Sequence, residues 1–258
     1  MELDIAVQLD YAVGGPVDLL LQIEAAELDD QRILDATLDT GWAGDGWRIA
    51  SESGVGRRQW LSLTNDFQCT YNARVAIDRV APDFAELPQV IAHNLPGEVV
   101  RYLMPSRFCP SDTFQTFVMA EFGDTTGGAR IAALRDWIEN RFAYVPGASG
   151  PRTTALETFV QRQGVCRDFA HVLITMARAS TIPARFASVY APDVNPPDFH
   201  AVAEVYLDDA WHLVDPTGMA DPTTIARIGV GSDAADVAFM SSFGPMSLRQ
   251  QRVSVMRA

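Results

Sequence analysis

The stretch from residue 165 to residue 179 constrains the fold of this chain more than any other part of the sequence. Apolar side chains at helical spacing form one stripe, and further apolar residues widen it around most of the helix. The stripe consists of Val165, Phe169, Val172, Leu173 and Met176, and the additions are Ala170, Ile174 and Ala177. Such a helix is stable only where other elements bury it. The rest of this 258-residue chain, long enough for one large or two small domains, must therefore pack around it.

Upstream of this helix, the hydrophobic pattern changes along the chain. Strand-length runs separated by turn residues occupy the first eighty residues, which is typical of a small antiparallel β-sandwich. Five prolines between residues 81 and 110 predict an extended connection, because each removes a backbone donor and restricts the residue before it. Apolar residues at helical spacing then predict helices over 131–142 and 153–163.

Downstream of the buried helix, the pattern returns to strands. The predicted strands cover residues 184–190, 201–207 and 211–215. The three residues between the last two strands favour an antiparallel hairpin. Helices followed by antiparallel strands indicate an α+β fold. The expected division is an N-terminal β domain over 1–95, a proline-containing connection over 96–125 and an α+β core over 126–258.

The charge of the chain disfavours two classes of partner. Lys and Arg number 20 against 33 Asp and Glu, which gives a formal net charge of −13. An acidic surface repels nucleic-acid phosphates and anionic lipids. The longest basic run is the pair Arg57-Arg58. We therefore expect neither nucleic acid nor a membrane as a partner.

The cysteines and histidines form no recognisable disulfide or metal pattern. The three cysteines include no CxxC pair, so neither a disulfide framework nor a thiolate zinc site is expected, and Cys69 and Cys109 are expected to be passive. No HxH or HxxxH pair is present, and we expect no metal site. The acidic N-terminus lacks a leader-like segment, and no apolar stretch approaches the ~20 residues of a membrane helix. These features predict a cytoplasmic protein with reduced thiols.

Cys166 is the first candidate for chemistry because it stands at the expected start of the buried helix. The free N–H groups and the positive dipole end of a helix favour a thiolate there. His200 begins one strand of the predicted hairpin and Asp215 ends its partner, so the hairpin can bring imidazole and carboxylate together. Such a carboxylate would orient a base beside an activated nucleophile. The alternatives are a small buried cysteine, a structural histidine and an aspartate that caps a turn.

Four sequence blocks around these residues resemble the transglutaminase-like superfamily. They are GVCRDFAH at 164–171, IPARF at 182–186, HAVAEV at 200–205 and WHLVDPT at 211–217. The blocks occur in the family's order and cover about residues 153–217. They resemble the bacterial transglutaminase-like cysteine proteases most closely, and the first part of the chain resembles, more loosely, the N-terminal β domain often fused to that core.

The resemblance implies a fold, a set of site residues and a chemistry. The fold would be an N-terminal β-sandwich-like domain followed by a papain-like transglutaminase core, with helices packed on an antiparallel sheet or partial barrel. Cys166 would be the nucleophile, His200 the general base and Asp215 the residue that orients it. The thiol would attack an amide carbonyl of a peptide or protein substrate and form a thioester, with no metal or organic cofactor.

Three functions are compatible with this resemblance. Transfer of the acyl group to water makes a hydrolase, which we prefer because nothing in the sequence specifies a protected amine site. Transfer to an amine makes a crosslinking transglutaminase. A protein that keeps this core but lacks catalytic activity would be a catalytically silent peptide- or protein-binding module. A thiol redox protein is less favoured, because no resolving cysteine lies near Cys166 in the sequence.

Other polar residues near the predicted site have structural expectations. On an ideal helix, His171 points ~140° away from Cys166, so we expect it to pack or hydrogen-bond elsewhere. Asp168 is expected to secure the first turn of the helix. His212 lies an odd number of residues from Asp215, so on a regular strand it faces the opposite side.

Two features leave the substrate side of the site undefined. Val202 stands where the family usually has an aromatic residue, two positions after His200. Its smaller side chain is expected to open the acyl pocket or weaken its wall. The backbone N–H of Cys166 is the expected oxyanion donor, and Gln161 and Gln163 are equivalent candidates for a second one.

Overall fold

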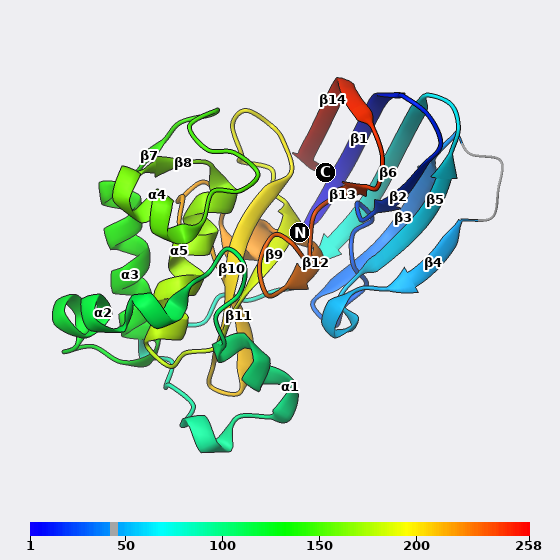
Figure 1. Ribbon diagram of the computed structural model, residues 1–258. Coiled ribbons are helices and arrows are strands. Elements are labelled where there is room, and N and C mark those ends of the chain that lie inside the picture. The colour runs from blue at the N-terminus through cyan, green and yellow to red at the C-terminus, as the bar shows by residue number, and fades with distance from the viewer. Residues whose placement is uncertain (42–45) are drawn as a thin grey trace.

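The computed structural model describes residues 1–41 and 46–258. In Figure 1 the helices lie on one side of a central sheet, and a β-sandwich lies on the other side. The α+β class predicted from the sequence is confirmed. Within the described residues, the structure contains no helix that is both long and apolar enough to cross a membrane.

The β-sandwich forms because its strands alternate between buried and exposed side chains. In β1, Leu3, Ile5 and Val7 are buried whereas Ala6 is exposed. The strands are β1 Glu2–Val13, β2 Val17–Leu21, β3 Gln31–Asp39, β4 Trp47–Ala50, β5 Arg57–Leu63, β6 Phe67–Ile77, β13 Met240–Ser242 and β14 Met246–Arg257. One sheet has the order β14-β1-β6-β3 and the other has the order β13-β2-β5-β4. The apolar sides of both sheets share one core.

The last two strands of the chain belong to this sandwich. β13 pairs antiparallel with β2, and β14 pairs antiparallel with β1. The sequence-based division placed residues 126–258 together in the core, whereas the structure pairs these two strands with the first part of the chain. Only Val253 and Val255 of β14 are buried. Its pattern is therefore too weak to indicate which sheet it joins.

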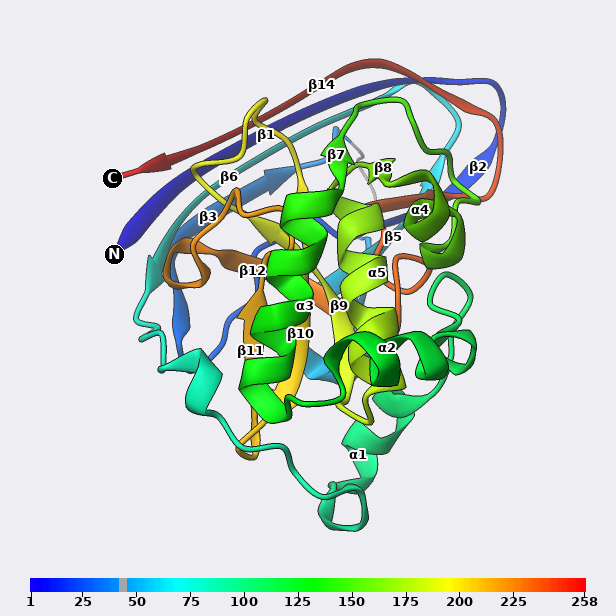
Figure 2. The ribbon, with the colours of Figure 1, turned by 90° about the vertical axis from the view of Figure 1, so that its left-hand side faces the viewer.

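The α+β core consists of helices packed on one face of an antiparallel sheet (Figures 1 and 2). The sheet order is β11-β10-β9-β12. Its strands are β9 Ala184–Tyr190, β10 His200–Leu207, β11 Ala210–Val214 and β12 Ala226–Gly231, and the main helices are α3 Gly127–Arg141, α4 Ala155–Gln161 and α5 Cys166–Ala179. From Asp168 to Ala179, every residue of α5 is buried. It contacts β9 and β10 as well as α3 and α4, which explains why even its polar residues Asp168, His171 and Arg178 are buried.

The segment predicted as a connection over 96–125 contains helices. α1 (Gly97–Val100) is short, whereas α2 (Gln115–Phe122) packs against α3 and α5. The rings of Phe117 and Phe122 lie 5.5 and 6.2 Å from that of Trp137, measured between centroids. This segment therefore contributes to the core. Short 3-10 turns cover Glu52–Gly54, Phe84–Glu86, Ala92–Asn94, Arg101–Leu103, Ser111–Thr113 and Pro222–Thr224.

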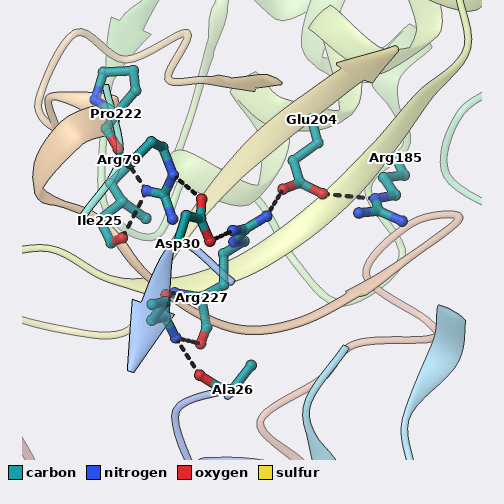
Figure 3. Close-up of polar contacts among 9 residues, drawn as sticks. Ala26, Asp30, Arg79, Arg185, Glu204, Pro222, Ile225 and Arg227 are labelled. Atoms are coloured by element: carbon teal, nitrogen blue, oxygen red, sulfur yellow. Dashed lines mark hydrogen bonds and ion pairs between the residues drawn. The ribbon is translucent and has the colours of Figure 1, made fainter. Parts of the chain in front are cut away.

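A buried network of ion pairs joins the sandwich to the core sheet (Figure 3). Glu204 on β10 has no exposed surface and accepts hydrogen bonds from Arg185 at 2.6 Å and from Arg227 at 2.9 Å. Arg227 also pairs with Asp30, whose carboxylate accepts a second hydrogen bond from Arg79 at 2.6 Å. Asp30 precedes β3 and Arg79 follows β6. The network therefore connects the β-sandwich to the core sheet through side chains that come from both.

Candidate active site

Cys166 is the first residue of α5 and is partly exposed. Asp168 secures the first turn of this helix, as predicted, because its carboxylate accepts a hydrogen bond from the backbone N–H of Val165 at 2.9 Å. Gly164 makes this turn possible: a Cβ there would lie 2.7 Å from the Cβ of Asp168. The glycine therefore allows the chain to approach the helix start closely and leaves the thiol partly accessible.

His200 and Asp215 meet at one end of the β10–β11 hairpin. His200 is the first residue of β10, and Asp215 directly follows β11. The imidazole Nε2 lies 2.8 Å from Oδ2 of Asp215, and both side chains are buried. Asp215 also accepts hydrogen bonds from Thr217 N–H at 2.9 Å, from the Thr217 hydroxyl at 2.7 Å and from Ala220 N–H at 2.9 Å. These donors hold the carboxylate in one orientation toward the imidazole.

The electrostatics of the three residues are coupled. Burial alone would lower the pKa of His200, but the hydrogen bond with Asp215 and the proximity of Cys166 raise it to about 10. Burial acts to raise the pKa of Asp215, but its bonds with His200 and Thr217 hold it below the ordinary value. The other ring nitrogen of His200, Nδ1, is buried and has no hydrogen-bond partner among the described residues. This nitrogen is therefore available to a further partner.

The shifted pKa values predict how this pair contributes to stability at different pH. A pKa of about 10 for His200, above the ordinary 6.5, means that its stabilisation is complete below pH 6.5 and is lost as the pH rises through 10. The lowered pKa of Asp215 means that its stabilisation is present above pH 3.8 and is lost in acid. We expect the free energy of unfolding of the wild type to exceed that of His200→Gln by the largest amount between pH 3.8 and pH 6.5. The difference should become smaller toward pH 10.

Urea unfolding at pH 5.5, 7.5 and 9.5 tests this dependence. The exposed His93 supplies the matched control, since His93→Gln should give a difference from the wild type that does not vary in this way. A difference between the wild type and His200→Gln that stays constant from pH 5.5 to 9.5 would contradict the assigned coupling.

Tyr144 is a residue at this site that sequence reasoning did not select. It belongs to β7 (Ala143–Tyr144), which pairs parallel with β8 (Gln163–Gly164) and brings Tyr144 beside Gly164. Its phenol lies close enough to Cys166 for the sulfur and the backbone N–H to change its pKa. The contact depends on two strands of two residues each, for which no sequence signal exists.

The other histidines lie outside this group, as the spacing predicted. The ring of His171 stacks on Phe108 with centroids 5.2 Å apart, and its Nε2 accepts a hydrogen bond from Ala234 N–H at 3.2 Å. Burial lowers the pKa of His171 to about 4. His212 Nε2 lies 3.0 Å from the carbonyl oxygen of Leu207. Both histidines therefore have structural contacts of their own.

Two expectations about nearby apolar residues have different outcomes. Cys69 and Cys109 are buried, and burial raises the pKa of each thiol to about 12, which suits passive packing. Val202 was expected to open an acyl pocket or weaken its wall. It has no exposed surface and belongs, with Ala187 and Ala220, to the apolar cluster on the sheet face opposite α5.

The main cleft near the site opens on a different side. It has a volume of about 1020 Å³ and lies between α3 and the residues around Trp211 and Gly218. Asp215 is among the residues that line it. Cys166 and His200 do not line it. Among residues 1–41 and 46–258, no group of three or more His, Cys, Asp or Glu side chains is arranged to hold a metal ion.

Comparison with known proteins identifies similar chains. The family model described as the Transglutaminase-like superfamily matches residues 117–216. An uncharacterized protein of Mycobacterium leprae is 32% identical over 119 residues, and one of Mycobacterium tuberculosis is 32% identical over 126 residues. These alignments cover 43% and 42% of this chain, and 42% and 40% of the relatives. The chain thus spans less than half the length of the curated relatives it matches.

A solved structure is similar over almost the whole chain. The crystal structure of a "Putative Cysteine Protease" from Cytophaga hutchinsonii has a TM-score of 0.90 and 33% sequence identity. The match covers 99% of this chain and 90% of that one, and so includes both the sandwich and the core. Together with the family model and the α+β architecture, this similarity shows that the chain belongs to the transglutaminase-like superfamily.

Proposed function

We propose that this protein is a cysteine-dependent amide or peptide hydrolase in which Cys166 is the nucleophile, His200 the general base and Asp215 its orienting partner. The observation that carries the proposal is the buried 2.8 Å contact between His200 and Asp215 beside a partly exposed thiol at a helix start. A histidine held in this way has one nitrogen bound to the carboxylate and the other free for the thiol. The similarity to the Cytophaga protein supports the same class.

The proposed reaction has two halves. His200 takes the thiol proton at Nδ1 and keeps it at neutral pH because its pKa is raised to about 10. Sγ of Cys166 then attacks the amide carbonyl carbon to give a tetrahedral intermediate. The C–N bond breaks as His200 returns the proton to the leaving amine, which leaves a thioester on Cys166. In the second half His200 takes a proton from water, and the hydroxide attacks the thioester. The C–S bond then breaks, which releases a carboxylic acid, and the proton on His200 is again shared with Sγ of Cys166. Asp215 holds the imidazole in place and balances its positive charge throughout.

Alkylation by iodoacetamide tests whether Cys166 is an activated nucleophile. We expect Cys166 to react selectively, because Cys69 and Cys109 are buried and their raised pKa values keep both thiols protonated. His200→Ala should slow the labelling of Cys166 by roughly 100-fold, since the base is lost. Mass spectrometry of the labelled peptides gives the three rates separately. Equally slow labelling of all three cysteines in both proteins would rule out an activated thiol.

Peptide profiling with the wild type and Cys166→Ala distinguishes the functions that share this fold. The proposed hydrolase should yield new peptide ends or deamidated glutamines that the variant does not produce. Amine crosslinks in place of these products would indicate the acyl transferase. Identical profiles for the two proteins would leave only the binding module.

A further inference from the structure

The position of Tyr144 is determined by backbone pairing around the start of α5. Its strand β7 runs parallel to β8, and Tyr144 is opposite Gly164, two residues before Cys166. The hydrogen bonds Ala143 N–H to Arg162 O and Val145 N–H to Gly164 O, each 2.8 Å, hold the strand on both sides of the tyrosine. The backbone of Tyr144 is therefore attached to the segment that carries the nucleophile, and the two cannot move independently.

The side chain of Tyr144 lies beside the first turn of α5. Its ring packs near that of Phe169, one turn along α5, with centroids 6.0 Å apart. Phe169 is buried in the core of the helical part, and Tyr144 is partly buried against the same core. Burial and the sulfur of Cys166 raise the pKa of Tyr144 to about 12, although the N–H of Cys166 acts to lower it. The phenol therefore keeps its proton at neutral pH and can donate a hydrogen bond beside the sulfur.

We propose that the Tyr144 hydroxyl is the second oxyanion donor of this site, acting with the backbone N–H of Cys166. This assignment rests on the proposed acyl-transfer function. When Sγ attacks a carbonyl carbon, the carbonyl π electrons move to oxygen, and that oxygen lies near the N–H of the nucleophile at the helix start. A phenol near both Sγ and this N–H is within reach of the same oxygen. No proton is transferred: Tyr144 donates a hydrogen bond that strengthens as the charge develops and weakens as the C=O bond forms again.

Other candidate donors fit the position less well. Gln161 is exposed at the end of α4, and neither it nor Gln163 hydrogen-bonds to Cys166 among the described residues. The Ser149 hydroxyl donates to Asp168 and is therefore already committed. Tyr144 is the neutral donor whose place beside Cys166 follows from strand register.

A comparison of two reactions of Cys166 in Tyr144→Phe tests this assignment. Acylation by p-nitrophenyl acetate passes through an oxyanion, whereas alkylation by iodoacetamide does not. Phenylalanine keeps the ring contact with Phe169, so the fold should be retained. We expect acylation to fall by roughly 100-fold and alkylation to change little, because only acylation needs the donor. Tyr206→Phe is the matched control: it removes a phenol in a separate apolar cluster and should leave both rates unchanged.

Each other result would overturn the assignment. An equal fall in both reactions would mean that Tyr144 supports the thiol itself, and a rise in both would mean that its hydroxyl obstructs the sulfur. Unchanged acylation would mean that the hydroxyl has no part in the reaction. If the wild type is alkylated at Cys166 but never acylated there, the proposed function fails first, and the role of Tyr144 fails with it.

Discussion

Asp215→Asn is expected to slow acylation of Cys166 by p-nitrophenyl acetate by about a thousandfold to ten-thousandfold, if the carboxylate orients and balances His200 as proposed. Both carboxylate oxygens face hydrogen-bond donors: Oδ2 accepts from Ala220 N–H and contacts His200, and Oδ1 accepts from Thr217. In Asp215→Asn, the amide NH₂ replaces one of these two oxygens. At either position it would face a hydrogen-bond donor instead of an acceptor. The substitution also removes the negative charge that raises the pKa of His200 to about 10. Both effects disfavour the protonated imidazole that the reaction requires.

Asp221→Asn supplies the matched control for this variant. Asp221 caps a 3-10 turn on the same loop, where its carboxylate accepts a hydrogen bond from Thr223 N–H at 2.8 Å. The same chemical change there should leave the acylation rate close to that of the wild type. Circular dichroism should show that both variants are folded. Acylation of Asp215→Asn within tenfold of the wild-type rate would argue against the role of Asp215.

Glu204→Gln is expected to lower the free energy of unfolding by about 3–5 kcal/mol. Burial acts to raise the pKa of Glu204, but the charges of Arg185 and Arg227 hold it below the ordinary value, so the carboxylate is ionised in the fold. Glutamine has one acceptor oxygen for two guanidinium groups, and its NH₂ must face one of them. The guanidinium of Arg185 also lies 4.0 Å from the ring centroid of Trp211, so it has little freedom to move away. Arg185 would lose its counter-charge, and Arg227 would keep only its pair with Asp30.

Urea unfolding at two pH values makes this prediction specific. The lowered pKa of Glu204 means that its stabilisation is present above pH 4.5 and is lost in acid, so the difference between wild type and variant should shrink at lower pH. Asp4→Asn is the control, because the Asp4–Arg74 pair is well exposed and should contribute little. A variant as stable as the wild type at pH 7 would show that the network of Figure 3 does not hold the two parts of the molecule together.

Local patterns predicted those elements whose burial is visible in their own residues. The predicted helix 165–179 corresponds to α5, and the predicted strand 184–190 to β9, because most side chains of a fully buried element are apolar. The hairpin of β10 and β11 was also predictable, since a short connection forces neighbouring strands together. The elements that sequence reasoning missed are those whose burial is partial. β14 buries only Val253 and Val255, and α2 lies in a proline-containing segment that suggested an extended chain.

The candidate site divides in the same way. Cys166, His200 and Asp215 were selected because each stands at the end of a recognisable element, in blocks that resemble a known family. Tyr144 and Glu204 were not selected, since their significance comes from partners distant in the sequence. Tyr144 lies 22 positions before Cys166 and reaches it through a two-residue strand pair. Glu204 is joined to Asp30 of the sandwich through Arg227.

The sequence by itself determined the α+β class, the buried helix and the three residues on which the proposed chemistry depends. These follow from local rules, because hydrophobic periodicity and element ends are written in neighbouring residues. Only the tertiary structure decided that β13 and β14 join the N-terminal sheets, that Val202 is buried on the sheet face opposite α5, and that a tyrosine lies beside the start of α5. Those facts depend on which distant segments pack together, and that choice minimises the free energy of the whole chain rather than of any one segment.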